Sequence, residues 1–319
     1  MNFLVTGGLG YIGTVLCDAL LSRGSKVVCV DNLRYGQGRL LSNFVRQPDF
    51  RFVKADAANV GLFLPEVDKA DVIVPLAALV GGPVCNLYKY KAEETNLTAV
   101  ARLVEAAGPS KRIVFPMTNS GYGQTDGSSE VTEESPLGPI SHYGTTKAEA
   151  EKIVLGHPNA VSLRLATVFG VSPRMRFDLL VNDLVARLMQ ATHKESVVIY
   201  EPDFWRNFVH VRDVVSAIMF MACRTHTGVF NLGDSRANRT KAQLAGLICD
   251  TLGLEQSLWR VGEGRDPDQR NYRVSNAKFE AAGFRCYYSL EDGIREVGRL
   301  LDHISESDVA EARNVLEGE

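Results

Sequence analysis

The first 23 residues constrain the fold most. Gly7, Gly10 and Gly13 separate the apolar run NFLVTG from a segment, Tyr11 to Arg23, whose apolar residues recur at helical spacing. Glycines permit a tight turn and let backbone segments approach each other closely. The sequence therefore predicts a strand, a tight turn and a helix at the start of the chain.

The same alternation continues through the first half of the chain. Near-continuous apolar runs, typical of strands buried on both faces, alternate with stretches of helical spacing. The runs are KVVCVD, FRFVKAD, DVIVPLAA, RIVFPMT and VSLRLATVFG. This pattern predicts a doubly wound α/β fold, a parallel Rossmann sheet covered by helices.

Because 319 residues exceed the usual size of one domain, we expect a Rossmann domain over 1–170 and a smaller, interleaved C-terminal α/β lobe over 171–319. Segments around 205–235 are expected to return to the first domain.

Composition and charge exclude several classes of protein. The net charge is −3 and no block of like charges occurs, so we expect no nucleic-acid partner and no membrane partner. No apolar run approaches the roughly 18 residues of a membrane span. The six cysteines lack a C-x-x-C pair and the six histidines lack metal-ligand spacing, which predicts no metal site and a reducing, cytoplasmic location.

The glycine pattern and a later carboxylate together predict a dinucleotide site. The start of a helix favours the negative charge of a pyrophosphate, and the glycines let it approach the backbone. Asp31 ends the second apolar run, 18 residues after Gly13. A carboxylate there accepts hydrogen bonds from the adenosine ribose and repels a 2′-phosphate, which favours NAD over NADP. A glycine-rich turn beside a solvated aspartate is the alternative.

A tyrosine and a lysine four positions apart indicate proton-transfer chemistry. Tyr143 and Lys147 share one face of an expected helix, 25 residues after Thr118 at a strand end. A phenol has a pKa of about 10, and lowering it by about two to three units needs on the order of 3–4 kcal/mol. The lysine ammonium and an oxidised nicotinamide both favour the phenolate, which could then take a hydroxyl proton while hydride moves to NAD. Lys147 could also hold the nicotinamide ribose. A solvated Tyr–Lys pair is the alternative.

These motifs resemble the extended short-chain dehydrogenase/reductase superfamily, and more narrowly its NAD-dependent nucleotide-sugar epimerase/dehydratase family. The resemblance runs along almost the whole chain and implies NAD as cofactor, a nucleotide-diphosphate sugar as substrate, and a homodimer. It also implies a set of cofactor-binding residues. These are Gly7, Gly10, Tyr11, Ile12, Gly13, Asp31, Asn32, Asp56, Ala57, Leu76, Ala77, Ala78, Asn96, Tyr143 and Lys147.

The resemblance implies a substrate site as well. Arg206 in WRNFVHVRDV and Arg270 in RDPDQRNYRVSNAK stand where the family binds the diphosphate, and Asp268 where it binds the nucleotide ribose. Arginine suits phosphate because its donors form a fixed fork. Arg174 and Arg176 are further candidates, although surface arginines are the alternative reading. Two departures occur: the family's usual histidine is Pro75, and a common asparagine is Thr167, which puts one substrate hydrogen bond in doubt.

The loop after Thr118 narrows the reaction. Dehydratases of the family carry T-D-E or S/T-x-E before the Y-G of this loop, and its decarboxylases tend to carry a glutamate there. This chain has Asn119 and Ser120, expected to face the substrate, and neither can act as a base on carbon. With Thr118, Tyr143 and Lys147 as the catalytic residues, the sequence favours a C4 epimerase that forms a transient 4-keto sugar. A C4 dehydrogenase that releases the keto sugar is the alternative. A 4,6-dehydratase and a non-catalytic NAD-sensing protein are less favoured.

Overall fold

The computed structural model describes residues 1–265 and 269–314. Its centre is a sheet of seven strands in the order β11-β7-β5-β4-β1-β2-β3, in which every pair of neighbours is parallel. The strands are β1 (Asn2–Thr6), β2 (Lys26–Asp31), β3 (Phe50–Lys54), β4 (Val72–Pro75), β5 (Arg112–Thr118), β7 (Ala160–Leu165) and β11 (Gly228–Leu232). The predicted doubly wound fold is confirmed.

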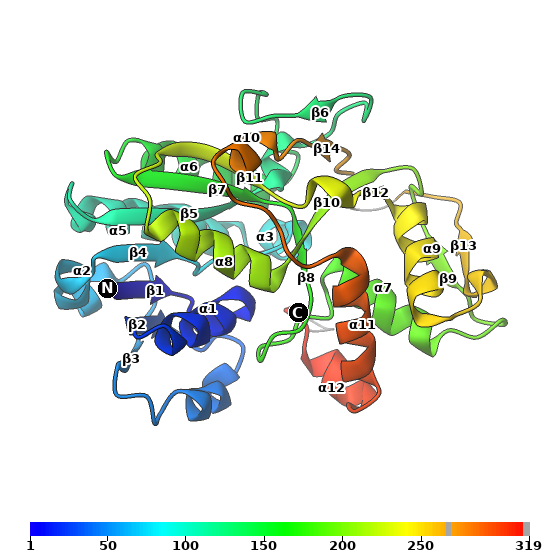
Figure 1. Ribbon diagram of the computed structural model, residues 1–319, viewed down its shortest axis with the longest axis horizontal. Coiled ribbons are helices and arrows are strands. Elements are labelled where there is room, and N and C mark those ends of the chain that lie inside the picture. Colours follow the sequence, from blue (N-terminus) through cyan, green and yellow to red (C-terminus); the bar gives the residue numbers. More distant parts are fainter. Residues whose placement is uncertain (266–268, 315–319) are drawn as a thin grey trace.

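Helices cover both faces of this sheet (Figure 1). Side chains alternate along each strand, so Phe3 and Val5 pack toward one face while Leu4 packs toward the other. The first face is covered by α1 (Tyr11–Ser22), α8 (Val211–Ala222) and α10 (Ala277–Ala281). The second face is covered by α2 (Leu64–Lys69), α5 (Ala99–Ala107) and α6 (His142–Leu155).

The run VSLRLATVFG does not form one strand. It divides at Ala166, whose N–H donates to the Leu232 carbonyl at 2.8 Å. The run therefore supplies β7 to the large sheet and β8 (Thr167–Phe169) to a second sheet, where β8 pairs with β10 (Trp205–His210). This switch joins the Rossmann sheet to the second lobe.

The second lobe is built from short strands and four helices around its own apolar core. Its strands are β8, β10 and β12 (Asn238–Thr240) in one sheet, and β9 (Val197–Ile199) with β13 (Trp259–Val261) in another. Its helices are α7 (Leu180–Gln190), α9 (Lys241–Leu252), α11 (Leu290–Leu301) and α12 (Glu306–Glu311). The connecting elements are α3 (Gly82–Leu87), α4 (Lys89–Glu93), a π-helical turn (Glu94–Thr98), and a strand pair, β6 (Glu130–Val131) with β14 (Arg273–Val274). The 3-10 turns are Gln37–Asn43, Val60–Phe63, Asn119–Tyr122, Ser235–Ala237 and Gln256–Leu258.

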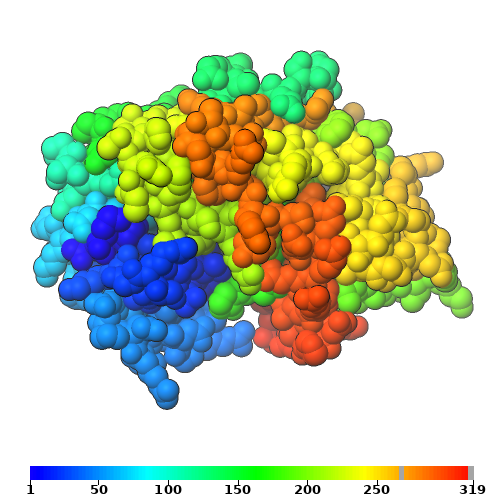
Figure 2. All heavy atoms as spheres, viewed as in Figure 1, coloured from blue at the N-terminus to red at the C-terminus, as the bar shows by residue number. Residues whose placement is uncertain are grey.

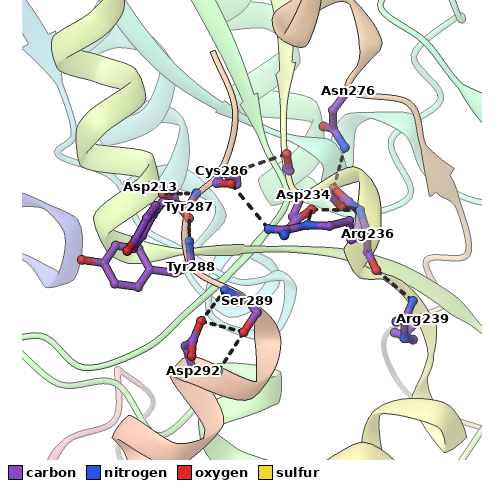
Figure 3. Close-up of polar contacts among 12 residues, drawn as sticks. Asp213, Asp234, Arg236, Arg239, Asn276, Cys286, Tyr287, Tyr288, Ser289 and Asp292 are labelled. Atoms are coloured by element: carbon purple, nitrogen blue, oxygen red, sulfur yellow. Dashed lines mark hydrogen bonds and ion pairs between the residues drawn. The ribbon is translucent and has the colours of Figure 1, made fainter.

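The segment before α11 is fixed to the large sheet's own helix (Figure 3). The Asp213 carboxylate on α8 accepts the backbone N–H groups of Tyr287 and Tyr288, each at 3.0 Å. Ser289 and Asp292 then form a capping box that begins α11. The orange-to-red C-terminal part of the chain consequently lies between the blue N-terminal part and the yellow segment near residue 250 (Figure 2).

Candidate active site

A cavity of about 800 Å³ lies at the carboxyl ends of the parallel strands. This edge is where open α/β sheets bind ligands. The first domain lines it with the turn after β1 and the ends of β2, β4 and β5, and the second lobe adds residues from several separate segments, including Arg176, Arg206 and Arg270. Ligands could therefore contact both lobes at once.

The glycine turn is shaped for close backbone approach. Gly7 has a φ of 70°, and a Cβ on it would lie 2.6 Å from the backbone nitrogen of Ala77. A Cβ on Gly13 would lie 2.3 Å from the Gly7 carbonyl oxygen. Helix α1 begins at Tyr11, and its N-cap, Gly10, provides no side-chain hydrogen bond. The first N–H groups of α1 are thus left for an anion, which fits the pyrophosphate of a dinucleotide.

Asp31 lies at the end of β2 and lines the cavity. One carboxylate oxygen accepts the Leu9 N–H at 3.1 Å, and the other accepts the Leu33 N–H at 2.9 Å and the Gln37 side-chain amide at 3.1 Å. Burial raises the pKa of Asp31 despite these bonds. A carboxylate has about four lone-pair sites, so room remains for a ribose hydroxyl. No sequence motif indicated Gln37, which orients this carboxylate.

Asp56 and Asn32 meet at the same end of the cavity. The Asp56 carboxylate accepts the Ala58 N–H at 3.0 Å, and the Lys91 ammonium and the Asn32 amide at 3.1 Å each. Burial acts to raise the pKa of Asp56, but these donors hold it below its ordinary value. The structure therefore brings the predicted adenosine-binding carboxylates together, and it adds Lys91 to them.

The catalytic pair lines the cavity from the first two turns of α6. The Ser141 hydroxyl caps this helix by accepting the Gly144 N–H at 3.1 Å. The Lys147 ammonium lies 4.1 Å from the centre of the Phe115 ring on β5. Lys147 is buried and Tyr143 partly buried, so their surroundings influence their protonation.

Burial shifts the pKa values of both residues of this pair. Burial raises the pKa of Tyr143 to about 12 and lowers that of Lys147 to about 7. A hydrogen bond with Thr118 and the guanidinium groups of Arg176 and Arg270 act against the first change. Burial, together with the nearby Cys85, thus outweighs the positive charges and favours the neutral phenol. A cationic nicotinamide fits here as the missing charge.

The two candidate substrate-binding residues of the polar loop after β5, Asn119 and Ser120, face in different directions. The Thr118 hydroxyl donates to the Ser120 hydroxyl at 3.0 Å, and an Arg270 N–H donates to the same oxygen. Ser120 lines the cavity, whereas Asn119 turns into the protein interior and does not line it. Neither polar atom of the Asn119 side chain has a hydrogen-bond partner in the described part of the chain. The predicted substrate contact of Asn119 is therefore not placed in the cavity.

Comparison with known proteins identifies the family. Residues 3–233 match the family model described as the NAD dependent epimerase/dehydratase family. The chain belongs to this family. UDP-glucuronic acid decarboxylase 2 of Arabidopsis thaliana is 28% identical over 309 residues, which cover 92% of this chain and 66% of the plant protein, so the chain spans about two thirds of that relative. The Bacillus subtilis protein YtcB, an uncharacterized UDP-glucose epimerase, is 30% identical over 314 residues, covering 92% of this chain and 96% of YtcB.

Solved structures agree with this assignment. The dTDP-glucose 4,6-dehydratase DesIV of Streptomyces venezuelae, with NAD bound, superimposes with a TM-score of 0.82 at 27% identity and covers 95% of this chain and 98% of its own. The chain is thus an NAD-dependent enzyme of the epimerase/dehydratase family, and NAD is its cofactor. Leu76, Ala77, Ala78 and Ala57, which the family resemblance assigns to the cofactor, line the cavity.

Asn96 has a different place from the one expected for this epimerase/dehydratase. It lies fully buried in the π-helical turn and does not line the cavity. Its side-chain amide accepts the Leu79 N–H at 2.7 Å and donates to the Leu79 carbonyl at 2.9 Å and the Thr146 hydroxyl at 3.3 Å. Because these bonds occupy the amide, Asn96 fixes the loop after β4 rather than contacting the cofactor.

The predicted arginines divide between the two ends of the family's cavity. Arg206 donates to the carbonyls of Trp205 at 2.9 Å and of Arg270, which places these two arginines side by side. Arg176 is bound through two hydrogen bonds, at 3.1 and 2.6 Å, to the Asp178 carboxylate. Arg174 lies instead toward the cofactor end, since its guanidinium carbon is 5.3 Å from the centre of the Tyr35 ring.

The second lobe also supplies residues that the sequence did not indicate. Lys241 and Gln269 line the cavity beside Arg206 and Arg270. The Lys241 ammonium donates to the Tyr200 carbonyl at 2.8 Å. No spacing rule singles out a lysine at the start of a helix, so only the fold reveals it. Asp268, the predicted ribose-binding residue, lies outside the described residues.

Among the described residues, no group of three or more histidines, cysteines, aspartates or glutamates is arranged to hold a metal ion. No helix in the same part of the chain is both long enough and apolar enough to cross a membrane.

Proposed function

We propose that this enzyme is a nucleotide-sugar epimerase that inverts C4 through a transient 4-keto sugar. The observation that carries the proposal is the absence of an available base on carbon near Tyr143, among the described residues that line the cavity. Asp31 and Asp56 lie at the adenosine end. The Asp178 carboxylate is held by Arg176, whose charge keeps the pKa of Asp178 low although burial opposes it.

The remaining acid among the described residues that line the cavity is also engaged. Asp183 forms ion pairs with Arg187 at 3.4 Å and with Arg313 at 3.0 Å. Ser120 stands at the loop position where, by resemblance, dehydratases carry a carboxylate, and its hydroxyl already accepts from Thr118 and Arg270. Removal of a C5 proton or loss of a C6 hydroxyl needs a carboxylate acid or base that these residues do not supply. Epimerisation at C4 needs neither.

The described residues can move one proton at the C4 oxygen. Tyr143 takes the proton of the C4 hydroxyl, and the Thr118 hydroxyl turns from Ser120 to donate a hydrogen bond to the developing phenolate. The Arg176 and Arg270 guanidiniums favour the same anion by their charge, and Lys147 does so in its protonated form. Bound NAD supplies the hydride acceptor and donor. When the keto sugar presents its other face, Tyr143 returns the proton and the inverted sugar forms.

The arginines of the second lobe support a diphosphate-linked substrate. Arg206 and Arg270 lie side by side at the cavity, with Lys241 and Gln269 beside them. Three cationic groups at one end suit the two charges of a nucleotide diphosphate. The sugar attached to it then extends toward Ser120 and Tyr143.

The test is product analysis with UDP-, GDP-, CDP- and dTDP-sugars in deuterated water. We expect one nucleotide to give a C4 epimer with no lasting absorbance at 340 nm and no deuterium in the sugar, because the hydride returns from the cofactor. Tyr143→Phe should abolish the reaction, and Tyr122→Phe, whose ring lies outside the cavity, should preserve it. A 4-keto-6-deoxy sugar with deuterium at C5, or a keto sugar with accumulated NADH, would overturn the proposal.

We also propose a cytoplasmic homodimer. Leu87, Tyr90 and Ile153, on α3, α4 and α6, are exposed by 60%, 81% and 38%, and these helices contact one another. An exposed apolar surface of this kind supports pairing through these helices. All six cysteines are free thiols, which supports a reducing compartment. Analytical ultracentrifugation of the wild type and of Tyr90→Glu tests the dimer, which the charge should dissociate.

A further inference from the structure

The loop between β8 and α7 rests directly on the glycine turn. The Ser172 hydroxyl donates to the Tyr11 carbonyl at 2.7 Å and is bonded to the Thr14 hydroxyl at 3.1 Å. The Arg174 N–H donates to the same Ser172 oxygen at 3.3 Å. The backbone of Arg174 is thus fixed beside the turn that fits the cofactor pyrophosphate.

The Arg174 side chain extends from there toward the adenosine end. Its guanidinium carbon lies 5.3 Å from the centre of the Tyr35 ring, which is cation–π distance. Tyr35 is in turn held to Asp31 through Gln37, which accepts the Tyr35 N–H at 2.9 Å and donates to Asp31 at 3.1 Å. Both Arg174 and Tyr35 line the cavity. The contact between them therefore bridges the two walls of the cofactor half.

The charge of Arg174 is not balanced by a carboxylate in the way that Arg176 is balanced by Asp178. In the described part of the chain its guanidinium donates to two neutral acceptors, the Met175 carbonyl at 2.6 Å and the Asn314 amide oxygen at 2.9 Å. A half-buried guanidinium beside a second arginine is stabilised by an anion. The strip between the glycine turn and Asp31 is where the cofactor's anionic pyrophosphate would lie.

We propose that Arg174 is a cofactor-binding residue, and that its contact with Tyr35 closes the cavity over NAD so that NADH stays bound between the two hydride transfers. This inference rests on the proposed epimerase and deepens it. An epimerase must keep NADH until the keto sugar has turned, whereas a dehydrogenase releases it. Retention of NADH by Arg174 would thereby distinguish an epimerase from a dehydrogenase. This role of Arg174 takes the place of the substrate contact that the sequence suggested for it.

The test measures the NADH dissociation rate of the full-length protein by stopped-flow fluorescence, with excess NAD as the chase. Arg174→Met keeps the length of the side chain and removes its charge, and we expect dissociation about 10–100-fold faster, the range for a hydrogen bond to a charged group. Arg260→Met, on the exposed face of β13, is the matched control and should leave the rate unchanged. Tyr35→Leu should give an increase of about 5-fold, whereas Tyr35→Phe, which keeps the ring, should match the wild type.

A rate within twofold of the wild type for Arg174→Met overturns the inference, and equal rates for Tyr35→Leu and Tyr35→Phe overturn the role of the ring. Circular dichroism confirms that each variant is folded. A second readout follows NADH during turnover: the wild type should show none free, and Arg174→Met should release NADH together with keto sugar. If the wild type itself accumulates NADH, the proposed epimerase fails, while the ratio of dissociation rates still decides the role of Arg174.

Discussion

Replacing Lys147 by methionine should stabilise the cofactor-free protein while abolishing its activity. Burial lowers the pKa of Lys147 from 10.5 to about 7, so the folded protein holds this proton less tightly than the unfolded chain does. The free-energy cost of holding the charged ammonium in the folded protein is complete below pH 7 and disappears as the pH rises toward 10.5. Each pKa unit corresponds to about 1.4 kcal/mol, which gives about 4 kcal/mol at pH 7 and about 2 kcal/mol at pH 9.

Removing this cost should stabilise the folded protein. The contact between Lys147 and Phe115 reduces that gain in stability by about 1 kcal/mol at pH 7, because a methionine cannot make a cation–π interaction. We therefore expect Lys147→Met to raise the free energy of unfolding by about 3 kcal/mol at pH 7 and by less at pH 9. Urea unfolding of both proteins at the two pH values measures this. Lys152→Met, on the exposed side of the same helix, should change little. A Lys147→Met protein that is less stable at pH 7, or whose advantage is the same at both pH values, refutes the reasoning.

Three further outcomes follow from the site. Glu151 lies one turn after Lys147, raises the pKa of Lys147, and is paired with Arg164 at 2.8 Å. Glu151→Gln should therefore lower the pH at which activity falls on the alkaline side. If the pH profile of kcat/KM does not shift, Glu151 is only a structural partner of Arg164. Thr118→Val removes the hydrogen bond to Tyr143 and should lower kcat by about 10–100-fold, measured by NMR of the epimer; a normal kcat contradicts its role. Asn119→Leu removes two buried polar atoms without partners in the described chain. The substitution should raise the free energy of unfolding, measured by urea titration, by about 1–2 kcal/mol. A loss of stability would mean that the amide forms hydrogen bonds in solution.

Local patterns predicted the first half of the fold because each signal lies within a few residues. The glycine turn, Asp31 and the pair on α6 depend on strand ends and helix faces, and these followed from spacing. Asn119 and Asn96 were misplaced because the direction of a side chain depends on neighbours distant in sequence, such as Leu79 for Asn96. Lys241 and Gln37 carry no motif, so only the assembled cavity shows that they belong to it.

The position of Arg174 illustrates a second limit. Family resemblance assigns a residue to a loop, and the loop after β8 lines the cavity with both Arg174 and Arg176. Where an arginine of that loop lies depends on how the loop is fixed, and here the Ser172 bonds to the glycine turn hold the Arg174 backbone. The pKa of Tyr143 shows the same dependence, because burial has no signature in a four-residue spacing.

The large sheet depends on a strand that is synthesised late, because β11 forms its edge. β11 completes the edge beside β7 only after residue 228, and Phe279 and Phe284 fill the core on that face still later. While the chain is being made, β7 therefore has an unpaired edge, although its residues are buried in the finished fold. Such an edge is a template for unwanted strand pairing. A fragment ending at residue 170 should aggregate rather than fold, and nascent chains should depend on chaperones until more than four fifths of the protein has left the ribosome.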